Sequence, residues 1–186
     1  LIKVAAARVE RRAPVLTPPP GLYEDFCARF PFDLTPDQQT AIDDIVDNLG
    51  SGQPADRLIC GDVGYGKTEV ALRAAFIAAM AEKQVAVVVP TTLLCRQHYD
   101  TFSNRFAGFP VRIAQISRMI GAKDAAIARE ALADGRVDNV IGTHALLTNK
   151  LTFRNLGLLV VDEEQHFGVA HKERLKQLRS DVHVLT

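Results

Sequence analysis

The stretch Leu58-Ile59-Cys60-Gly61-Asp62-Val63-Gly64-Tyr65-Gly66-Lys67-Thr68 decides the fold of this chain, because a short apolar run leads directly into a glycine-rich loop. The loop fits the pattern G-x-x-x-x-G-K-[ST] at Gly61, Gly66, Lys67 and Thr68. Its three glycines allow the backbone N–H groups to turn inward around an anion, and a following helix aims its positive N-terminal end at the same anion. The stretch therefore predicts a strand, a phosphate-binding loop and a helix in succession.

The chemistry of this loop predicts a nucleoside triphosphate with Mg²⁺ as its ligand. Lys67 is expected to reach the terminal phosphates, and the hydroxyl of Thr68 is expected to bind Mg²⁺, a hard cation that prefers oxygen ligands. The residues expected to surround the phosphates are Gly61, Asp62, Val63, Gly64, Tyr65, Gly66, Lys67 and Thr68. The alternative interpretation is a glycine turn between a strand and a helix, without a ligand.

Length and composition predict one globular domain. The chain has 186 residues, of which 47% are hydrophobic, and its formal net charge is zero, so charge neither supports nor excludes a nucleic-acid partner. Cys27, Cys60 and Cys95 match no zinc-ligand spacing and predict reduced thiols in a cytoplasmic protein. The sequence contains neither an apolar run long enough for a membrane span nor a signal-peptide pattern at its start. It also lacks an initial methionine, so we expect a fragment of a longer protein.

The N-terminal part of the sequence predicts a tail followed by two helices. Residues 1–21 are expected to form the end of a helix, over residues 1–12, and a proline-rich linker, and residues 22–186 are expected to form the globular lobe. Helical spacing predicts helices over residues 22–30 and 36–49. Thr35, Pro36 and Gln38 fit the N-cap, first helical position and capping-box partner of the second helix, and Gly50 is expected to end it.

Strands and helices are predicted to alternate after the loop. The β-branched run at residues 85–89 is typical of a strand buried on both faces of a parallel sheet. Further strands are predicted at residues 111–116, 137–142, 156–161 and from residue 183, and helices at residues 69–81, 90–106 and 122–133. The predicted fold class is therefore α/β, an open, doubly wound parallel sheet with helices on both faces and ligands at the carboxyl ends of the strands.

Acidic residues follow directly on one of these strands, in Asp162-Glu163-Glu164-Gln165. In a triphosphatase, one carboxylate at this place holds the Mg²⁺ shell and the next orients and deprotonates the attacking water, which predicts these roles for Asp162 and Glu163. The alternative is a solvated loop that begins with acids. His166 and His171 lie nearby without metal-ligand spacing, so we expect them to be surface histidines.

Several segments together resemble the first motor lobe of the bacterial transcription-repair coupling factors, which are superfamily-two DNA translocases related to the branch-migrating, fork-reversing helicases. The segments are residues 30–38, 61–70, 89–94, 97–99, 141–144, 161–165 and 171–174. The resemblance implies a RecA-like P-loop NTPase lobe that uses ATP and Mg²⁺ on double-stranded DNA together with a second motor lobe. It also implies RNA polymerase and nucleotide-excision repair proteins as partners of other parts of the full protein.

The resemblance also implies roles for individual residues. Gln38 would read the adenine, with Phe32 as a stacking partner, although spacing alone equally allows a purely capping role for Gln38 and a core position for Phe32. The residues in or near segments that face DNA, where they would hold phosphates without reading sequence, are Thr91, Thr92, Arg96, Arg118, Thr143 and His144. Thr92 is alternatively a helix cap and Thr143 part of a turn. His166 stands where the family pattern has an arginine.

Two other functions are compatible with the sequence. A lobe of a branch-migrating, fork-reversal helicase would share the same motifs and would prefer branched DNA. A P-loop protein that binds nucleotide without DNA, such as a small-molecule kinase or a regulatory module, would show no response to duplex DNA.

Overall fold

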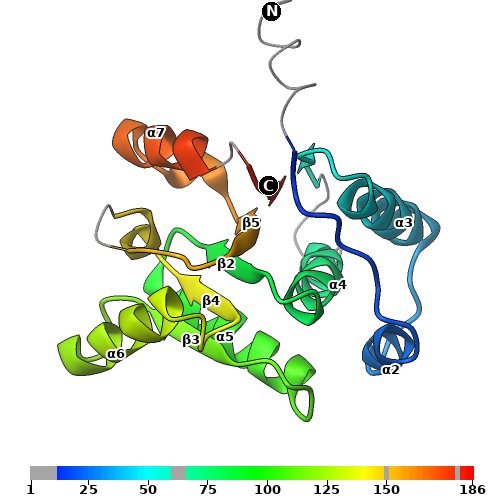
Figure 1. Cartoon of the computed structure of the whole chain (residues 1–186), viewed down its shortest axis with the longest axis horizontal. Coiled ribbons are helices and arrows are strands. Elements are labelled where there is room, and N and C mark those ends of the chain that lie inside the picture. The colour runs from blue at the N-terminus through cyan, green and yellow to red at the C-terminus, as the bar shows by residue number, and fades with distance from the viewer. Residues whose placement is uncertain (1–11, 60–65, 149–150, 179–180) are drawn as a thin grey trace, which may run out of the picture.

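A six-stranded, all-parallel sheet forms the centre of the computed structural model, which describes residues 12–59, 66–148, 151–178 and 181–186 (Figure 1). The strand order is β1-β6-β5-β2-β4-β3. The strands are β1 (Asp56–Arg57), β2 (Gln84–Val88), β3 (Ile113–Ile116), β4 (Asn139–Gly142), β5 (Leu156–Val161) and β6 (His183–Leu185). The predicted parallel α/β sheet is therefore confirmed.

Helices cover both faces of this sheet. The α-helices are α2 (Leu22–Ala28), α3 (Pro36–Gly50), α4 (Lys67–Met80), α5 (Thr92–Phe106), α6 (Ala122–Ala133) and α7 (Val169–Leu178), and two short 3₁₀ helices are η1 (His144–Leu147) and η2 (Glu164–His166). The sequence analysis did not predict α7, η1 or η2. In the part of the chain that the structure describes, no helix is long and apolar enough to cross a membrane.

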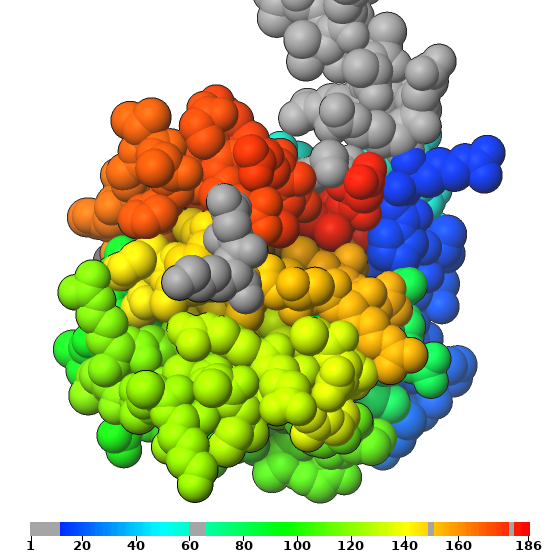
Figure 2. All heavy atoms as spheres, turned by 60° about the vertical axis from the view of Figure 1, so that its left-hand side comes forward, coloured from blue at the N-terminus to red at the C-terminus, as the bar shows by residue number. Residues whose placement is uncertain are grey.

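Strand β2 shows how one strand contributes to two hydrophobic cores. Val85 and Val87 pack into a core with α2, α3, α4 and α5, whereas Ala86 and Val88 point to the opposite face and pack with α6, η1 and α7. Figure 2 shows the second face, on which α6 (yellow-green) and α7 (orange) lie on either side of the yellow segment that contains η1. Because both faces of β2 are buried, the strand is apolar from Val85 to Val88, as its β-branched run predicts.

A buried ion-pair network fixes α4 among its neighbours. The carboxylate of Glu69, 3% exposed, accepts from Arg73 Nε at 2.8 Å and from Arg105 Nη2 at 2.8 and 3.0 Å through its two oxygens. Arg105 also donates to the carbonyl of Phe26 at 2.9 Å, and its guanidinium lies 4.4 Å above the Phe26 ring. One carboxylate therefore links α4 with α5, and through Arg105 also with α2.

Side-chain caps define the starts of α3 and α5. Thr35 accepts from Gln38 N at 3.2 Å, and Gln38 Oε1 accepts from Thr35 N at 2.9 Å, which confirms the predicted capping box. Helix α3 runs one residue beyond the predicted bound at residue 49 and ends at Gly50, as expected.

The cap of α5 is Thr91, whose hydroxyl accepts from Leu94 N at 3.2 Å. Thr91 has extended backbone angles, φ −128° and ψ 156°, whereas Thr92 is already the first helical residue. The interpretation of Thr92 as the cap was therefore wrong, because a capping residue must stand outside the helical conformation.

The strand before the phosphate loop lies slightly earlier than predicted. Strand β1 pairs Asp56 with Val184 and Arg57 with Leu185, and Leu58 is 72% exposed. Ile59 N still donates to Thr186 O at 2.7 Å, so the chain continues beside β6 after β1. The apolar residues that precede the loop are thus not a buried strand, and Cys60 lies outside the described residues.

The segment predicted as a linker is tied to the lobe. Leu16 is fully buried and its N–H donates to Leu49 O at 2.9 Å. His183, also fully buried, accepts from Ala55 N through Nδ1 at 3.2 Å and donates from Nε2 to Pro14 O at 2.8 Å, and burial lowers its pKa. The predicted helix over residues 1–12 falls almost wholly outside the described residues, and Arg12 itself is not helical.

We predict that Arg105→Ala lowers the free energy of unfolding by about 3 kcal/mol, because it leaves a buried carboxylate with one cation instead of two. Urea denaturation followed by circular dichroism measures the change. Arg96→Ala on the same helix is the control, since the Arg96–Asp100 pair is exposed on both sides and separated by 3.9 Å, and its loss should cost at most about 1 kcal/mol. Equal losses in the two variants would contradict a structural role for the Glu69 network.

Candidate nucleotide and DNA site

Lys67 and Asp162 both lie at the carboxyl edge of the sheet. Lys67 is the first residue of α4, and Asp162 directly follows β5. The pKa of the Asp162 carboxyl lies below its usual range, because His98 donates a hydrogen bond to it and because the positive charge of Lys67 is close by. The structure therefore brings together a cation and a carboxylate that the sequence analysis assigned to the phosphates and to Mg²⁺.

Gly66 forms the turn that leads from the loop into α4. Its backbone is left-handed, with φ +70° and ψ 21°, and a Cβ on this residue would lie 2.2 Å from Gln38 Nε2. Only glycine fits this position without displacing Gln38. The end of the loop therefore lies against the Gln38 amide, while the expected phosphate-binding residues 61–65 lie outside the described residues.

The oxygen atoms near Lys67 fit Mg²⁺. Thr68 follows Lys67 in the first turn of α4 and is partly exposed, and Asp162 has 36% of its side chain exposed. A hydroxyl and a carboxylate are the hard oxygen donors that Mg²⁺ takes, and this ion usually takes one or two protein ligands beside phosphate oxygens and waters. The donor set that the chain offers here is of that kind.

Glu163 has an unusual backbone conformation. It has φ 52° and ψ 51°, and it is one of two non-glycine residues with positive φ among the described residues. Its side chain is 45% exposed, and its Oε2 lies 3.6 Å from Nε2 of His166. The left-handed turn makes the chain change direction immediately after Asp162.

Phe32 lies on the surface. It is 72% exposed and meets the ring of Phe30 edge to face, with 5.6 Å between the centroids. The alternative that Phe32 fills the core is therefore wrong, whereas its stacking role remains a prediction. The capping role of Gln38 is confirmed, and adenine recognition by this side chain also remains a prediction.

The sequence analysis missed His98 as a site residue. Its Nε2 lies 3.1 Å from Asp162 Oδ2, and its side chain is only 16% exposed. A signal for this contact is present in the sequence, because Cys95, His98 and Phe102 follow one another at helical spacing on the buried face of α5. A polar residue within such an apolar stripe indicates a specific partner.

Two of the predicted DNA-binding residues meet each other, and a third residue joins them. Arg118 Nη2 donates to His144 Nε2 at 3.5 Å, since a guanidinium cannot accept, and the His144 ring stacks on His171 with 5.1 Å between centroids. The pKa of His144 is lowered, mainly because the ring is partly buried and further because His171 and Arg118 lie nearby. These three side chains form a cluster from the segment after β3, from η1 after β4 and from α7, and His171 was expected only as a surface histidine.

The chain reaches this cluster through a close contact at Gly142. A Cβ on Gly142 would lie 2.6 Å from Ile116 O and 2.5 Å from Leu146 Cγ, so β4 and the following turn could not pack as they do with a larger residue. Thr143 next to it is 2% exposed, and its hydroxyl has no hydrogen-bond partner among the residues described. Thr143 is therefore not a surface residue like its neighbour His144.

The remaining predicted DNA-binding residues lie at the start of α5. Thr91 and Arg96 are exposed, and Thr92 is partly exposed. The Thr91 hydroxyl accepts the capping hydrogen bond, and Arg96 forms only a loose, exposed pair with Asp100. The structure thus places these three residues on the first two turns of the helix that also carries His98.

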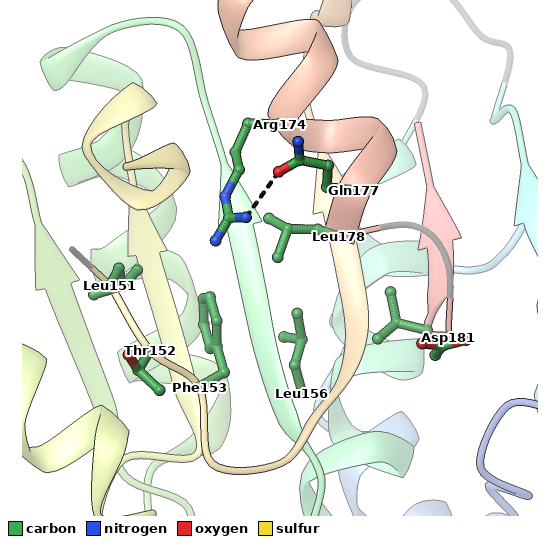
Figure 3. Close-up of a pocket in the computed structure, with 9 residues that line it drawn as sticks. Leu151, Thr152, Phe153, Leu156, Arg174, Gln177, Leu178 and Asp181 are labelled. Atoms are coloured by element: carbon green, nitrogen blue, oxygen red, sulfur yellow. Dashed lines mark hydrogen bonds between the residues drawn. The ribbon is translucent and has the colours of Figure 1, made fainter. Parts of the chain in front are cut away.

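A cavity of about 420 Å³ lies away from these residues (Figure 3). It is lined from α7 and from the segments that lead into β5 and β6, and Arg174 within it donates to Gln177 Oε1 at 3.0 Å. Because the segments before parallel strands lie opposite their carboxyl ends, this cavity is not the site that Lys67 and Asp162 form.

The sequence is similar to transcription-repair-coupling factors. It is 54% identical over 164 residues to the protein from Escherichia coli (strain K12), and this alignment covers 88% of this chain and 14% of the relative. It is 52% identical over 189 residues to the protein from Rickettsia prowazekii (strain Madrid E), and that alignment covers 100% of this chain and 17% of the relative. The chain therefore spans about a seventh of the length of these relatives. The resemblance expected from the motifs is confirmed.

The fold and the sequence family agree with this similarity. A solved structure of RecG bound to a three-way DNA junction superimposes with a TM-score of 0.84 at 33% identity, covering 98% of this chain and 24% of that chain. This match and the parallel sheet confirm the RecA-like P-loop fold. The model of the DEAD/DEAH box helicase family matches residues 35–185, which confirms the expected class of enzyme, one that uses ATP. The chain therefore belongs to the DEAD/DEAH box helicase family.

Proposed function

We propose that this chain is the first, ATP-binding motor lobe of a double-stranded DNA translocase that displaces stalled RNA polymerase and couples transcription to DNA repair. The observation that carries the proposal is that His98 Nε2 lies 3.1 Å from Asp162 Oδ2 at the carboxyl edge of the sheet, the same edge at which Lys67 begins α4. The similarity to transcription-repair-coupling factors over most of the chain supports the finer assignment. A motor acting on DNA in this role would work in the bacterial cytoplasm.

In the proposed nucleotide site, residues 61–66 surround the phosphates with backbone N–H groups, and Lys67 neutralises the terminal phosphates. Thr68 and Asp162 hold Mg²⁺, which when bound neutralises charge on the phosphate oxygens. Gln38 reads the adenine from its position beside Gly66, and the exposed ring of Phe32 supplies a stacking surface.

Glu163 is the proposed general base. Its exposed carboxylate directly follows Asp162, and the base in phosphoryl transfer must reach a water molecule in line with the terminal phosphate. His166 pairs with Glu163 at 3.6 Å, so we propose that it orients this carboxylate in place of the family arginine. An arginine finger comes from a second motor lobe elsewhere in the full-length protein.

The proposed DNA surface holds phosphates without reading base sequence. Thr91, Thr92 and Arg96 contribute hydroxyls and a charge from the start of α5, and Arg118, beside His144 and His171, contributes a further charge. Thr143 contributes only by holding the turn that carries His144, because its hydroxyl is buried and its N–H donates to Ile116 O at 3.3 Å.

A second candidate is a fork-reversal lobe, which the fold similarity to junction-bound RecG favours. Such a lobe would prefer branched DNA over linear duplex. RNA polymerase and nucleotide-excision repair proteins are proposed partners of other parts of the full-length protein.

We predict that Lys67→Ala weakens ATP binding by at least about tenfold, because it removes the cation that faces the terminal phosphates. Isothermal titration calorimetry with Mg-ATP measures the affinity. Lys123→Ala, an exposed lysine in the first turn of α6, is the matched control and should bind as the unaltered chain does. Equal affinities in the two variants would exclude Lys67 from the phosphate site.

Glu163→Gln should separate binding from turnover. The variant keeps the shape of the side chain but loses the base, so the full-length protein should still bind Mg-ATP while its turnover falls by roughly 10²-fold or more. Phosphate release in single- and multiple-turnover experiments provides the rates, with Glu164→Gln as the neighbouring control. Turnover near the wild-type rate in Glu163→Gln would assign the base to another residue.

The activity of the isolated lobe tests the motor-lobe assignment. The 186-residue chain alone should bind Mg-ATP weakly and release phosphate near the background rate with or without duplex DNA, because an arginine finger contributes about 10³- to 10⁵-fold to the rate. Joining the chain to the second lobe should restore hydrolysis and its stimulation by DNA. Robust DNA-stimulated hydrolysis by the chain alone would show a complete catalytic site in one lobe and refute the assignment.

A further inference from the structure

His98 makes a contact that the nucleotide-binding motifs do not account for. Its Nε2 lies 3.1 Å from Oδ2 of Asp162, while 16% of the histidine side chain and 36% of the aspartate side chain are exposed. The two residues are 64 positions apart in the sequence and belong to different elements, α5 and the segment after β5. The contact therefore depends on the tertiary structure.

The direction of this hydrogen bond follows from the chemistry of the two groups. An ionised carboxylate only accepts hydrogen bonds, so Nε2 of His98 is the donor. His98 thus holds one oxygen of a carboxylate that retains further capacity to accept or to bind a cation.

Both partners are fixed by their surroundings. His98 lies between Cys95 and Phe102, which are fully buried on the same face of α5, and Cys95 Sγ lies 3.6 Å from Ile141 O in β4. The backbone of Asp162 is held by its N–H, which donates to Val88 O at 2.9 Å. A hydrogen bond between two anchored groups restricts the orientation of the carboxylate more than a bond to a mobile surface side chain would.

We propose that His98 is a positioning residue that orients Asp162 toward Mg²⁺ and joins the Mg²⁺ site to helix α5, the helix that begins with the proposed DNA contacts Thr91, Thr92 and Arg96. This inference rests on the proposed function of Asp162. Groups that hydrogen-bond to a metal-binding carboxylate fix its orientation and basicity, and their loss commonly costs 10- to 100-fold in metal affinity. Because α5 is a continuous helix, a displacement of its first turn by DNA is transmitted to His98.

The test uses the full-length protein that contains this lobe and measures binding of a fluorescent, non-hydrolysable ATP analogue at increasing Mg²⁺ concentrations. His98→Ala should raise the Mg²⁺ concentration for half-maximal binding by about tenfold or more, while saturating Mg²⁺ restores binding. His98→Gln should behave almost as wild type, because the glutamine Nε2 occupies nearly the place of the histidine Nε2. His98→Asn should behave as His98→Ala, because its amide is too short to reach Asp162.

Thr101→Ala is the control on the same helix. The exposed Thr101 hydroxyl donates only to the backbone of its own helix, at Gln97 O, so this variant should leave the Mg²⁺ requirement unchanged. Repeating the titration with duplex DNA tests the connection to α5: DNA should shift the Mg²⁺ requirement of the wild type and not that of His98→Ala. An unchanged Mg²⁺ requirement in His98→Ala, or equal values for the Gln and Asn variants, would overturn the inference. Nucleotide binding by the wild type without any dependence on Mg²⁺ would instead overturn the proposed function of Asp162.

Discussion

The ion pairs of the buried Glu69 carboxylate determine where the phosphate-binding end of α4 lies. Burying a lone carboxylate would cost several kcal/mol, so the fold requires the cations of Arg73 and Arg105 beside it. Arg105 comes from α5 and also bonds the carbonyl of Phe26 in α2. Since Lys67 stands only two residues before Glu69, the network fixes three helices at the place where the nucleotide is proposed to bind.

The parallel sheet places further site residues in a row beside the start of α4. Asp162 N donates to Val88 O and Val89 N donates to Gly142 O, so β5, β2 and β4 end at the same level. The residues that follow these ends are Asp162, the start of α5 and His144. The proposed nucleotide site and the proposed DNA surface therefore lie next to each other along one edge of the sheet. Helix α5 follows β2, the middle one of these three strands, and contacts both.

The sequence predicted the elements whose signals are local. The capping box at Thr35 and the apolar run of β2 placed a helix and a strand correctly, and the phosphate-loop pattern and the acidic run identified Lys67 and Asp162. What could not be predicted depends on tertiary contacts. The hydrogen bond of His98 joins distant segments, and α7 is a polar helix in which Leu175 is the one buried residue, so it has almost no apolar periodicity. The cap Thr91 and the first helical residue Thr92 differ only in backbone conformation, which composition does not encode.

Glu163 illustrates the difference between the binding and the catalytic parts of this site. A non-glycine residue with left-handed backbone angles costs of order 1–3 kcal/mol, which the surrounding structure must offset. The cost is retained directly beside Asp162, where the chain leaves β5 and enters η2. Asp162 itself is held by His98 and by β2, whereas Glu163 is 45% exposed and contacts His166 at 3.6 Å. The carboxylate proposed to bind Mg²⁺ is thus anchored within the lobe, while the proposed base faces outward, as expected if a second lobe completes its surroundings.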